Sequence, residues 1–330
     1  MSDAQRGPDA GRPVSGPLAF VTDAGEAGQR LDVVLARRTG LSRSTVARLV
    51  VEGLATVDGA PARKSHVVRA GETVVCALPA PRRATLVPEP VPLRVVYEDD
   101  WLLVVDKPAG VVVHPAPGHE RGTLVQGLLA RGIGGGHELR PGVVHRLDRE
   151  TSGLLVVARH EDAHRRLVAA MGHRAIERVY VALVVGDLPQ EEGTVDAAIG
   201  RHLRERRRMS VHAARPRPAV THFRVLGRVP GFTLLEVRLE PGRTHPIWVH
   251  WAAVGHRGGG AATYGGRPRP AGLGRHFLHA ARLALPHPDD GHRLCFAAPL
   301  PADLAAFLDG LGLGATLPPD LRAAQPPAGT

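Results

Sequence analysis

Apolar residues near the start of the chain recur at the spacing of two consecutive helices. In the segment "QRLDVVLARRTG", Leu31, Val34 and Leu35 form one helical face, and Gly40 stands where a helix would end. A second helix is predicted over "LSRSTVARLVVEG", which ends at Gly53. The spacing therefore predicts a pair of short helices joined by a tight connection.

After Gly53 the pattern changes to the alternation that is typical of strands. The segment "LATVDGAPARKSHVVRAGETVVCALP" carries an Asp58-Gly59 turn between alternating residues. Two helices and a small sheet predict one compact module over residues 28–80. Residues 1–27 are rich in Gly, Pro, Ala and Asp without periodicity, so we predict a flexible tail there.

The rest of the chain alternates apolar runs with polar turns. Residues 81–92 are rich in proline and predict a linker. Strands are predicted at "LRVVYED", "WLLVVDKP", "GLLVVARH", "VYVALVVG" and "FTLLEVRLEP", and helices at roughly residues 161–172 and 301–311. This pattern predicts an α+β domain with a mainly antiparallel, mixed sheet over residues 93–312. A second flexible tail is predicted over residues 313–330.

The charge balance favours a polyanionic partner. The 330 residues carry a formal net charge of +10, and clustered cations attract nucleic acid partly through the release of counterions. Only Lys64 and Lys107 are lysines among the 42 basic residues, and Arg, Ala, Gly and Pro are abundant throughout. Because this composition indicates a general coding bias, the charge needs the support of a motif.

The sequence lacks the signals of disulfide-rich, thiolate metal-binding, membrane and secreted proteins. Cys76 and Cys295 form no CxxC pair, which argues against a disulfide framework and against a thiolate metal site. No stretch reaches the roughly 20 apolar residues of a membrane span, and the first residues lack an apolar secretory core. We therefore expect a cytoplasmic protein that does not bind a membrane.

The eighteen histidines do not form a recognisable metal motif. They include no HExxH arrangement, and no Cys or carboxylate completes a ligand set, so we expect no metal ion. The glycines of "GIGGGHE" lack the Lys-Ser/Thr of a nucleotide-binding loop, and a flexible connection is predicted there instead.

The most specific segment is "VVHRLDRETSGLLVVAR", residues 143–159. Asp148 lies between Arg146 and Arg149, just before a Thr-Ser-Gly turn that leads into an apolar strand. Flanking arginines stabilise an ionised carboxylate, and a positioned carboxylate can act as a nucleophile. The alternative is a structural ion pair at a turn.

"HRLDRETSGLLVVA" is similar to the signature of the pseudouridine synthases that include the ribosomal RNA uridine enzymes. Further segments follow in family order: "YEDDWLLVVDKPAGVVVHPAPGHERGTLVQGLL", "RVYVALVVG", "PGRTH", "FLHAARLALPHP" and "FAAPLPADL". The N-terminal helices, "GLATVDG" and "KSHVVRAGETV" resemble the S4 RNA-binding domain, with Asp58 where Asn is more usual. Together the resemblances cover nearly all of residues 28–310.

The resemblance implies isomerisation of uridine to pseudouridine in RNA, most specifically in large-subunit ribosomal RNA, without a cofactor. Nothing in the sequence demands more than a monomer. It implies that Asp148 is the catalytic residue, which either assists bond cleavage at the sugar or removes a proton. Tyr180 would stack on the displaced uracil, and Arg146 would hold the target base out of its stack. His145 and Arg243 are expected to bind the substrate.

The S4-like module implies a second set of RNA contacts. Its expected RNA-binding residues are Arg30, Ser42, Arg43, Arg48 and Lys64. The alternative is that these are ordinary solvated charges on the surface of a small domain.

One segment departs from the family pattern. In "GRTHPIWVHW", Pro246 replaces Gln and Trp248 replaces the Arg that pairs with the catalytic Asp, and "GHRGGGAATYGG" diverges shortly afterwards. A buried carboxylate without its cation has a raised pKa, and Pro246 removes a donor that a strand would need. Arg243 or Arg149 is a hypothetical replacement. The alternatives are a synthase with a rebuilt or impaired site, an inactive RNA-binding paralogue, and a local error in the sequence.

Overall fold

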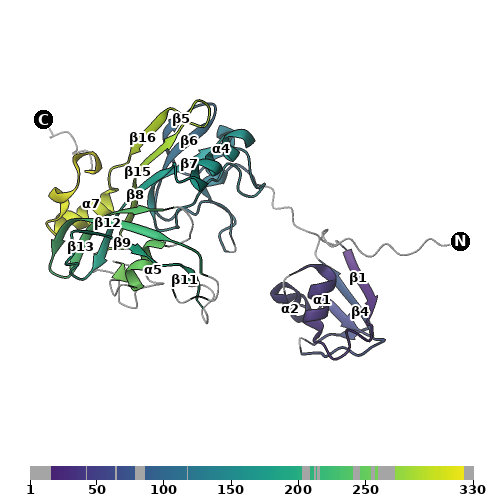
Figure 1. Ribbon diagram of the computed structural model, residues 1–330. Coiled ribbons are helices and arrows are strands. Elements are labelled where there is room, and N and C mark those ends of the chain that lie inside the picture. Colours follow the sequence, from purple (N-terminus) through teal and green to yellow (C-terminus); the bar gives the residue numbers. More distant parts are fainter. Residues whose placement is uncertain are drawn as a thin grey trace. The chain divides into compact units, whose positions relative to one another are not determined.

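The chain folds into two compact units, Met1–Thr85 and Leu86–Thr330, which are described separately (Figure 1). The computed structural model describes residues 16–41, 43–63, 65–78, 86–116, 118–202, 209–211, 213, 216–240, 246–253, 257–258 and 272–322.

The N-terminal unit packs two helices against a four-stranded antiparallel sheet of order β1-β4-β2-β3. Its elements are β1 (Gly16–Val21), α1 (Leu31–Thr39), α2 (Arg43–Val51), β2 (Ala55–Val57), β3 (Ala60–Pro61) and β4 (Thr73–Leu78). Strand β4 alternates exposed and buried residues, because only one face of the sheet is covered. Asp58 and Gly59 both have positive φ at the β2–β3 turn, as a two-residue hairpin requires.

The prediction of a flexible tail over residues 1–27 is wrong where the structure describes it. Strand β1 pairs with β4 along its whole length, from Gly16 opposite Leu78 to Val21 opposite Thr73. The segment "GPLAFV" is too short to show periodicity, and it is fixed only by the partner strand.

The second unit is built on a ten-stranded sheet of order β5-β6-β7-β15-β8-β13-β12-β9, with β14 beside β8 and β16 beside β15. Its strands are β5 (Arg94–Glu98), β6 (Leu102–Lys107), β7 (Ser152–Ala158), β8 (Glu177–Val185), β9 (Glu192–Asp196), β12 (Val220–Val229), β13 (Phe232–Leu239), β14 (Arg257–Gly258), β15 (Leu278–Pro286) and β16 (Arg293–Ala297). Among these pairings, β7 with β15 is parallel and the others are antiparallel, which confirms the predicted fold class.

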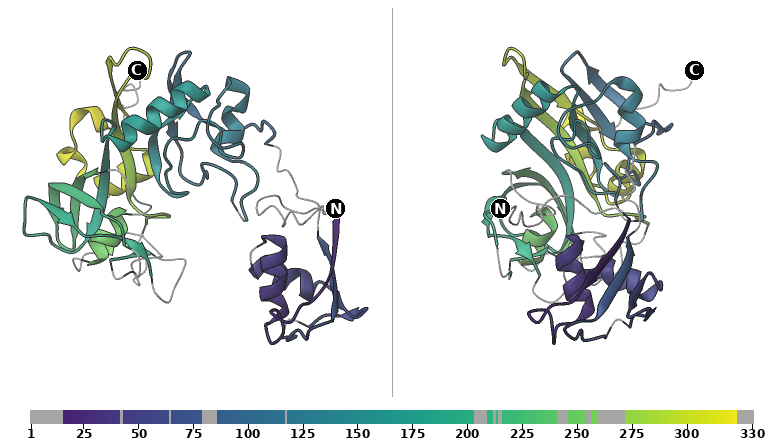
Figure 2. Two further views of the ribbon diagram at one scale, coloured as in Figure 1. Left: turned by 45° about the vertical axis from the view of Figure 1, so that its right-hand side comes forward. Right: turned by 90° about the vertical axis from the view of Figure 1, so that its right-hand side faces the viewer.

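Helices cover both faces of this sheet, as the two views of Figure 2 allow the reader to follow. Its helices are α3 (Leu124–Leu128), α4 (Glu161–Gly172), α5 (Pro246–Ala253) and α7 (Ala302–Gly310), and a small separate sheet joins β10 (Gly200–Arg201) to β11 (Met209–Ser210). Leu103 and Val105 share a core with α3 and α5, whereas Leu102 and Val104 share a core with α4. Because successive side chains point to opposite faces, strands β6 and β7 are buried almost throughout.

The predicted strands and helices of this unit are confirmed, but two predicted flexible segments are ordered. Within the predicted tail 313–330, the chain forms two short 3-10 helices, η2 (Gly314–Thr316) and η3 (Pro319–Leu321). Leu313, Leu317 and Leu321, which lie in or beside them, are buried in the same core as α7. The "GIGGGHE" segment packs on the start of α4, where the backbone N–H of Gly136 donates to Glu161 at 2.8 Å. No helix within the described ranges is long and apolar enough to cross a membrane.

Candidate active site

Asp148 stands on the loop that enters strand β7. Its side chain is partly exposed, and its carbonyl oxygen accepts a hydrogen bond from the Thr151 N–H at 3.1 Å, which closes a turn before β7. Gly153, at the start of that strand, has φ +111°, and a Cβ there would overlap the backbone of Ala280 on β15. Glycine is therefore required for β7 and β15 to pair in parallel directly after the Asp148 turn.

Lys107, at the end of β6, stabilises one side of this loop through hydrogen bonds. Its side chain is fully buried, and Nζ donates to the carbonyl oxygens of Pro108 at 2.8 Å, Val111 at 2.9 Å and Arg149 at 3.3 Å. The Gly110 N–H also donates to the Arg149 carbonyl, at 2.8 Å. The "KPAG" turn and the residue that follows the candidate carboxylate are thus held by one buried amine.

Lys107 also places positive charge near Asp148. Burial lowers the pKa of Lys107 to about 7, and the carboxylate of Asp148 is the largest of the effects that oppose this decrease. Three carbonyl acceptors are oriented toward the amine, which favours its protonated form. The candidate carboxylate therefore has a buried cation in its electrostatic neighbourhood.

Arg275, just before β15, fastens the other side of the loop. It is buried, forms a bidentate pair with Asp303 at 2.6 and 3.1 Å, and donates to the Glu150 carbonyl at 2.9 Å and to Ser152 Oγ at 3.2 Å. A bidentate pair fixes the guanidinium plane, so the backbone that it contacts is fixed as well.

Two buried histidines complete the attachment to β15. Thr151 Oγ1 lies 2.9 Å from His276 Nε2, and Ser152 Oγ lies 2.9 Å from His279 Nδ1. His279 Nε2 donates to the Ala298 carbonyl at 3.1 Å, so its Nδ1 accepts from the Ser152 hydroxyl. Burial lowers the pKa of His279 to about 4, and the ring is neutral at pH 7. The four residues after Asp148 are therefore all anchored by side chains distant in sequence.

Tyr180 faces the same region from strand β8. Its side chain is buried, and burial raises the pKa of its phenol, with the charge of Asp148 adding to this increase. A hydrogen bond and the charge of Arg178 act in the opposite direction. The structure thus brings Asp148 and Tyr180, the two predicted catalytic residues, into one electrostatic environment.

His145 is neutral and attached to the backbone. Its Nε2 accepts from the Val156 N–H at 3.3 Å, which places the ring proton on Nδ1. Burial lowers the pKa of His145 to about 3, and the charge of Arg178 contributes to the decrease. Nδ1 is buried without a hydrogen-bond partner in the part of the chain that the structure describes.

Within the divergent segment, Pro246–Ala253 form a helix, α5, rather than the strand considered from the sequence. Proline suits the first position of a helix, where its missing N–H leaves no bond unmade, and α5 begins at Pro246. Trp248 is 3% exposed, and its ring meets that of His276 edge-on with centroids 5.2 Å apart. Its Nε1 has no hydrogen-bond partner among the described residues. Trp248 therefore fills this position by apolar packing.

The arginines beside Asp148 separate in the structure. Arg146 is exposed, whereas Arg149 directs its Nε to the Gly110 carbonyl at 3.2 Å and to the Glu150 carboxylate at 3.6 Å. These contacts do not favour Arg149 as the replacement cation. Arg243, the other candidate and a predicted substrate contact, lies outside the described residues.

One group of side chains in the described ranges has the spacing of metal ligands. Ligand atoms of His287, Asp290 and His292, at the β15–β16 turn, lie within 4.8 Å of one another. This turn is at the far end of β15 from His276, so the group is separate from the Asp148 site. The order of residues in the sequence does not single out this group, because its spacing across a turn matches no metal motif.

In the N-terminal unit, two predicted RNA contacts share one acidic partner. Arg30 Nε lies 3.0 Å from Asp32 Oδ1 and Arg43 Nη2 lies 3.0 Å from Asp32 Oδ2, while both arginines stay largely exposed. The hydrogen bond from Arg30 is the main cause of the lowered pKa of Asp32. The buried carboxylate thus holds both guanidinium groups at one place on the surface.

The other predicted contacts of this unit are not brought to that place. Arg48 is exposed and lies 3.7 Å from Glu52 along helix α2. Ser42 and Lys64 lie outside the described residues. For these three residues RNA binding stays a prediction.

Two family models match the chain. The model described as RNA pseudouridylate synthase matches residues 101–253, and the S4 domain model matches residues 29–74. The second match coincides with the module formed by α1, α2 and the small sheet.

Curated relatives match over most of their length. A protein of Chloroflexus aurantiacus named uncharacterized RNA pseudouridine synthase is 51% identical over 285 residues, which are 85% of this chain and 89% of the relative. The ribosomal large subunit pseudouridine synthase D of Pseudomonas aeruginosa is 41% identical over 294 residues, with 85% and 91% covered. The solved structure of human RNA pseudouridylate synthase domain containing 1 has a TM-score of 0.53 at 29% identity and covers 65% of this chain and 87% of its own.

Proposed function

We propose that this chain, which belongs to the RNA pseudouridylate synthase family, converts uridine to pseudouridine in large-subunit ribosomal RNA with Asp148 as its catalytic carboxylate. The observation that carries the proposal is the attachment of the Asp148 loop. Lys107 holds it on one side, and Arg275 with two histidines holds it on the other. A carboxylate that must meet one reacting atom needs such preorganisation.

The relatives and the N-terminal unit support the substrate class. The Pseudomonas relative, 41% identical, is named for the ribosomal large subunit. The S4 domain presents Arg30 and Arg43 together on its surface, and two cations around the single carboxylate of Asp32 leave a net positive charge for contacts with phosphates. RNA is therefore the proposed partner, and the large-subunit RNA is the proposed class.

The reaction explains why these residue types suffice. The bond from N1 to the ribose C1′ breaks, the uracil turns, C5 bonds to C1′, C5 loses its hydrogen as a proton, and N1 takes up a proton. Electrons and atoms balance without an oxidant, so the isomerisation itself needs no redox cofactor. Asp148 either attacks or stabilises the sugar or accepts the C5 proton. Tyr180 stays protonated because its pKa is raised, and it offers an uncharged ring to the uracil.

Target uridines must leave the base stack before these groups can reach them. Unstacking costs a few kcal/mol, which contacts to the phosphates and the flipped base must offset. Arg146 is exposed two residues before Asp148, and this position suits the proposed role of holding the base out. His145 and Arg243 remain proposed substrate contacts.

Trp248 is the observation that favours a second candidate, an RNA-binding protein without isomerase activity. It removes the arginine that the family pattern places beside the catalytic Asp. The buried Lys107 weakens this candidate, because it supplies a cation whose charge acts on Asp148. We therefore favour the enzyme.

Tritium release tests the proposal. Ribosomal RNA labelled with tritium at uracil C5 is incubated with the native chain and with Asp148→Asn, which keeps the side-chain volume. Release by the native chain and a loss of at least about 1,000-fold in the variant, with RNA affinity within about 3-fold, are expected. No release by the native chain despite RNA binding would support the second candidate.

A further inference from the structure

A cavity of about 330 Å³ opens beside the Asp148 loop. Among the described residues, three valines line it together with four histidines and two arginines: His114, His137, His145, His164, Arg140 and Arg146. Arg146 connects the cavity to the candidate active site, because it precedes Asp148 by only two residues. The proposed reaction assigns no role to the other side of the cavity.

The cavity wall is fixed by close packing. A Cβ on Gly136 would lie 2.7 Å from ring atoms of His164, so the glycine run lies directly against this ring. His164 Nε2 lies 3.3 Å from the Val143 carbonyl, and the N–H of Gly136 donates to Glu161. The segment predicted as a flexible connection therefore forms one side of a built cavity.

The histidine rings contribute hydrogen-bonding groups to the cavity, and two of them, His114 and His145, do so without a charge. Burial lowers the pKa of His114, with Arg146 and Arg140 adding to the decrease, and it lowers the pKa of His145 to about 3. His137 Nδ1 accepts from the Leu139 N–H at 3.1 Å, so Nε2 is left as a donor. The cavity thus combines imidazole groups with two permanent cations.

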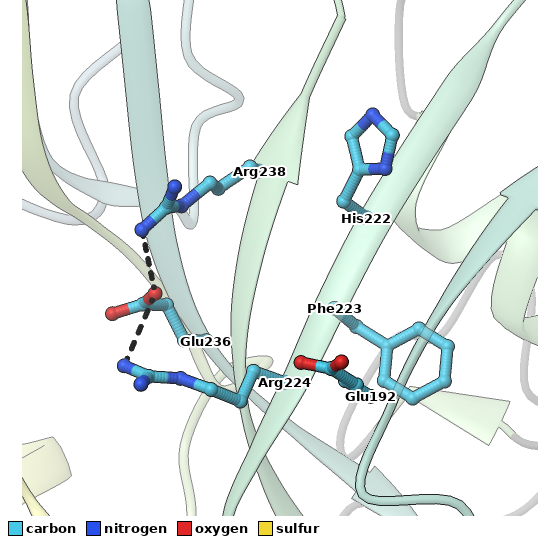
Figure 3. A pocket seen from close by; sticks show the side chains of 6 residues that line it. All are labelled: Glu192, His222, Phe223, Arg224, Glu236 and Arg238. Carbon is cyan, nitrogen blue, oxygen red and sulfur yellow. Dashed lines mark hydrogen bonds and ion pairs between the residues drawn. The ribbon is translucent and has the colours of Figure 1, made fainter.

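Among the described residues, these two cations have no acidic partner. Arg140 and Arg146 are exposed, neither forms an ion pair with a described carboxylate, and no described Asp or Glu lines the cavity. Two other cavities of the same unit differ in this respect. In the cavity of Figure 3, Glu236 lies between Arg224 and Arg238 at 3.5 and 3.3 Å. In the third cavity, Arg174 lies 2.6 Å from Glu240.

The contrast defines the ligand class. Where a carboxylate already neutralises the arginines, an incoming anion gains little and meets repulsion. A cavity with two guanidinium groups that no described carboxylate pairs, and with an imidazole donor, favours an anion with several acceptor oxygens; the phosphates of RNA are such anions, and arginine binds them in a bidentate manner. We propose that this cavity binds a backbone phosphate of the RNA, within about two nucleotides of the target uridine, through Arg140, Arg146 and His137.

The location rests on the proposed function, because Asp148 marks the target nucleotide. Two residues of chain span at most about 7 Å, which keeps a phosphate held at Arg146 close to the base that reacts at Asp148. His137 and Arg140 precede the isolated bridge between Val143 and Val157, and Arg146 follows it, so the phosphate would be contacted from both ends of this segment. Such a contact positions the strand and carries no base specificity.

Ethylation interference tests this assignment. End-labelled fragments of large-subunit ribosomal RNA are randomly ethylated at their phosphates, and the bound fraction is selected at half saturation by the native chain, Arg140→Ala, Arg140→Lys or Arg165→Ala. Arg165 is the matched control, since it is an exposed arginine on α4 that pairs with Asp162 outside the cavity. Release of tritium from fragments labelled at a single uridine locates the modified uridine independently.

We expect ethylation of one phosphate near that uridine to block binding of the native chain and of Arg165→Ala. Arg140→Ala should bind about 10-fold more weakly, lose this interference, and reduce the salt slope of binding by about 0.7, the value for one phosphate on a single strand. Arg140→Lys keeps the charge and should keep the interference.

Interference that persists unchanged in Arg140→Ala, or an unchanged salt slope, would overturn the cavity assignment. So would interference confined to phosphates far from the modified uridine. If the native chain releases no tritium, the proposed isomerisation fails by that result alone. The interference pattern is a binding measurement, and it still decides whether the cavity holds a phosphate.

Discussion

The two sides of the candidate active site are built by different means. The Asp148 loop is held by polar contacts from Lys107 and from the residues before and within β15. Helix α5, on the other side, contributes Trp248 by apolar burial and leaves its indole N–H unpartnered among the described residues. The hydrogen-bonded side keeps the pattern of the family, and the apolar side departs from it.

This difference indicates which part of the site sets the position of the carboxylate. Hydrogen bonds to backbone carbonyls fix a loop in one geometry, whereas an apolar ring fills volume without directing a charged group. We infer that the position of Asp148 depends on the polar side and tolerates a change on the α5 side.

The largest effect is expected from removing the buried amine. Lys107→Met keeps much of the volume but removes the Nζ donor from three carbonyl oxygens. The Arg149 carbonyl keeps the Gly110 N–H, and the other two acceptors are each left unpaired at a cost of about 1–3 kcal/mol before relaxation. We expect single-turnover tritium release to fall by at least about 100-fold and the urea midpoint to decrease. Arg131→Met, which breaks an exposed pair with Glu98, is the control. A native rate in Lys107→Met would show that the polar side does not position Asp148.

An intermediate effect on stability is expected when the pH is lowered, because His279 is neutral in the folded protein. The pKa of His279 is about 4 in the folded protein and 6.5 as its ordinary value, so between these pH values the unfolded chain binds the proton and the folded protein does not. Stability therefore falls as the pH decreases through this window, by about 3 kcal/mol for this residue.

His279→Gln sharpens this test, because glutamine keeps a donor and an acceptor without titrating. The free energy of unfolding in urea is measured from pH 7 to pH 4. Its slope against pH should correspond to about one proton fewer taken up on unfolding in the variant than in the native chain. The same pH dependence in both proteins would mean that His279 is protonated in the fold, and that its contact with Ser152 differs from the one described.

The smallest effect is expected on the α5 side. Trp248→Phe removes an unpartnered buried N–H together with part of the ring, and these changes oppose each other. We expect the free energy of unfolding to change by less than about 1 kcal/mol, whereas Trp248→Ala should cost about 3–5 kcal/mol. A large loss in Trp248→Phe would indicate that the indole N–H has a partner that matters for stability.

The sequence predicted the parts of the fold whose apolar pattern is uninterrupted. Helix α1 and strands β6, β7 and β8 bury apolar residues on a regular spacing, and their patterns were sufficient. Strand β15 was not predicted as a strand because it carries Arg282, whose charge is satisfied by Glu236 and Asp320 from distant segments. Such partners are visible only in three dimensions.

The sequence predicted some residues of the candidate site and missed others. Asp148 and Tyr180 followed from the resemblance, and the structure brings them together. Lys107 and Arg275 were missed as site residues, because their roles depend on contacts with backbone carbonyls rather than on a local pattern. The "KP" and "RHFLHA" segments carried a local signal, since the first places a basic residue at the end of an apolar strand and the second places one just before such a strand.

The most direct test of the central claim compares tritium release by the native chain and by Trp248→Arg under single-turnover conditions. The claim predicts that the native chain releases tritium and that restoring the arginine raises the rate by less than about 10-fold, because Lys107 and β15 already position Asp148. A native chain that releases none, beside an active Trp248→Arg variant, would contradict it and would show that the missing arginine silences the site.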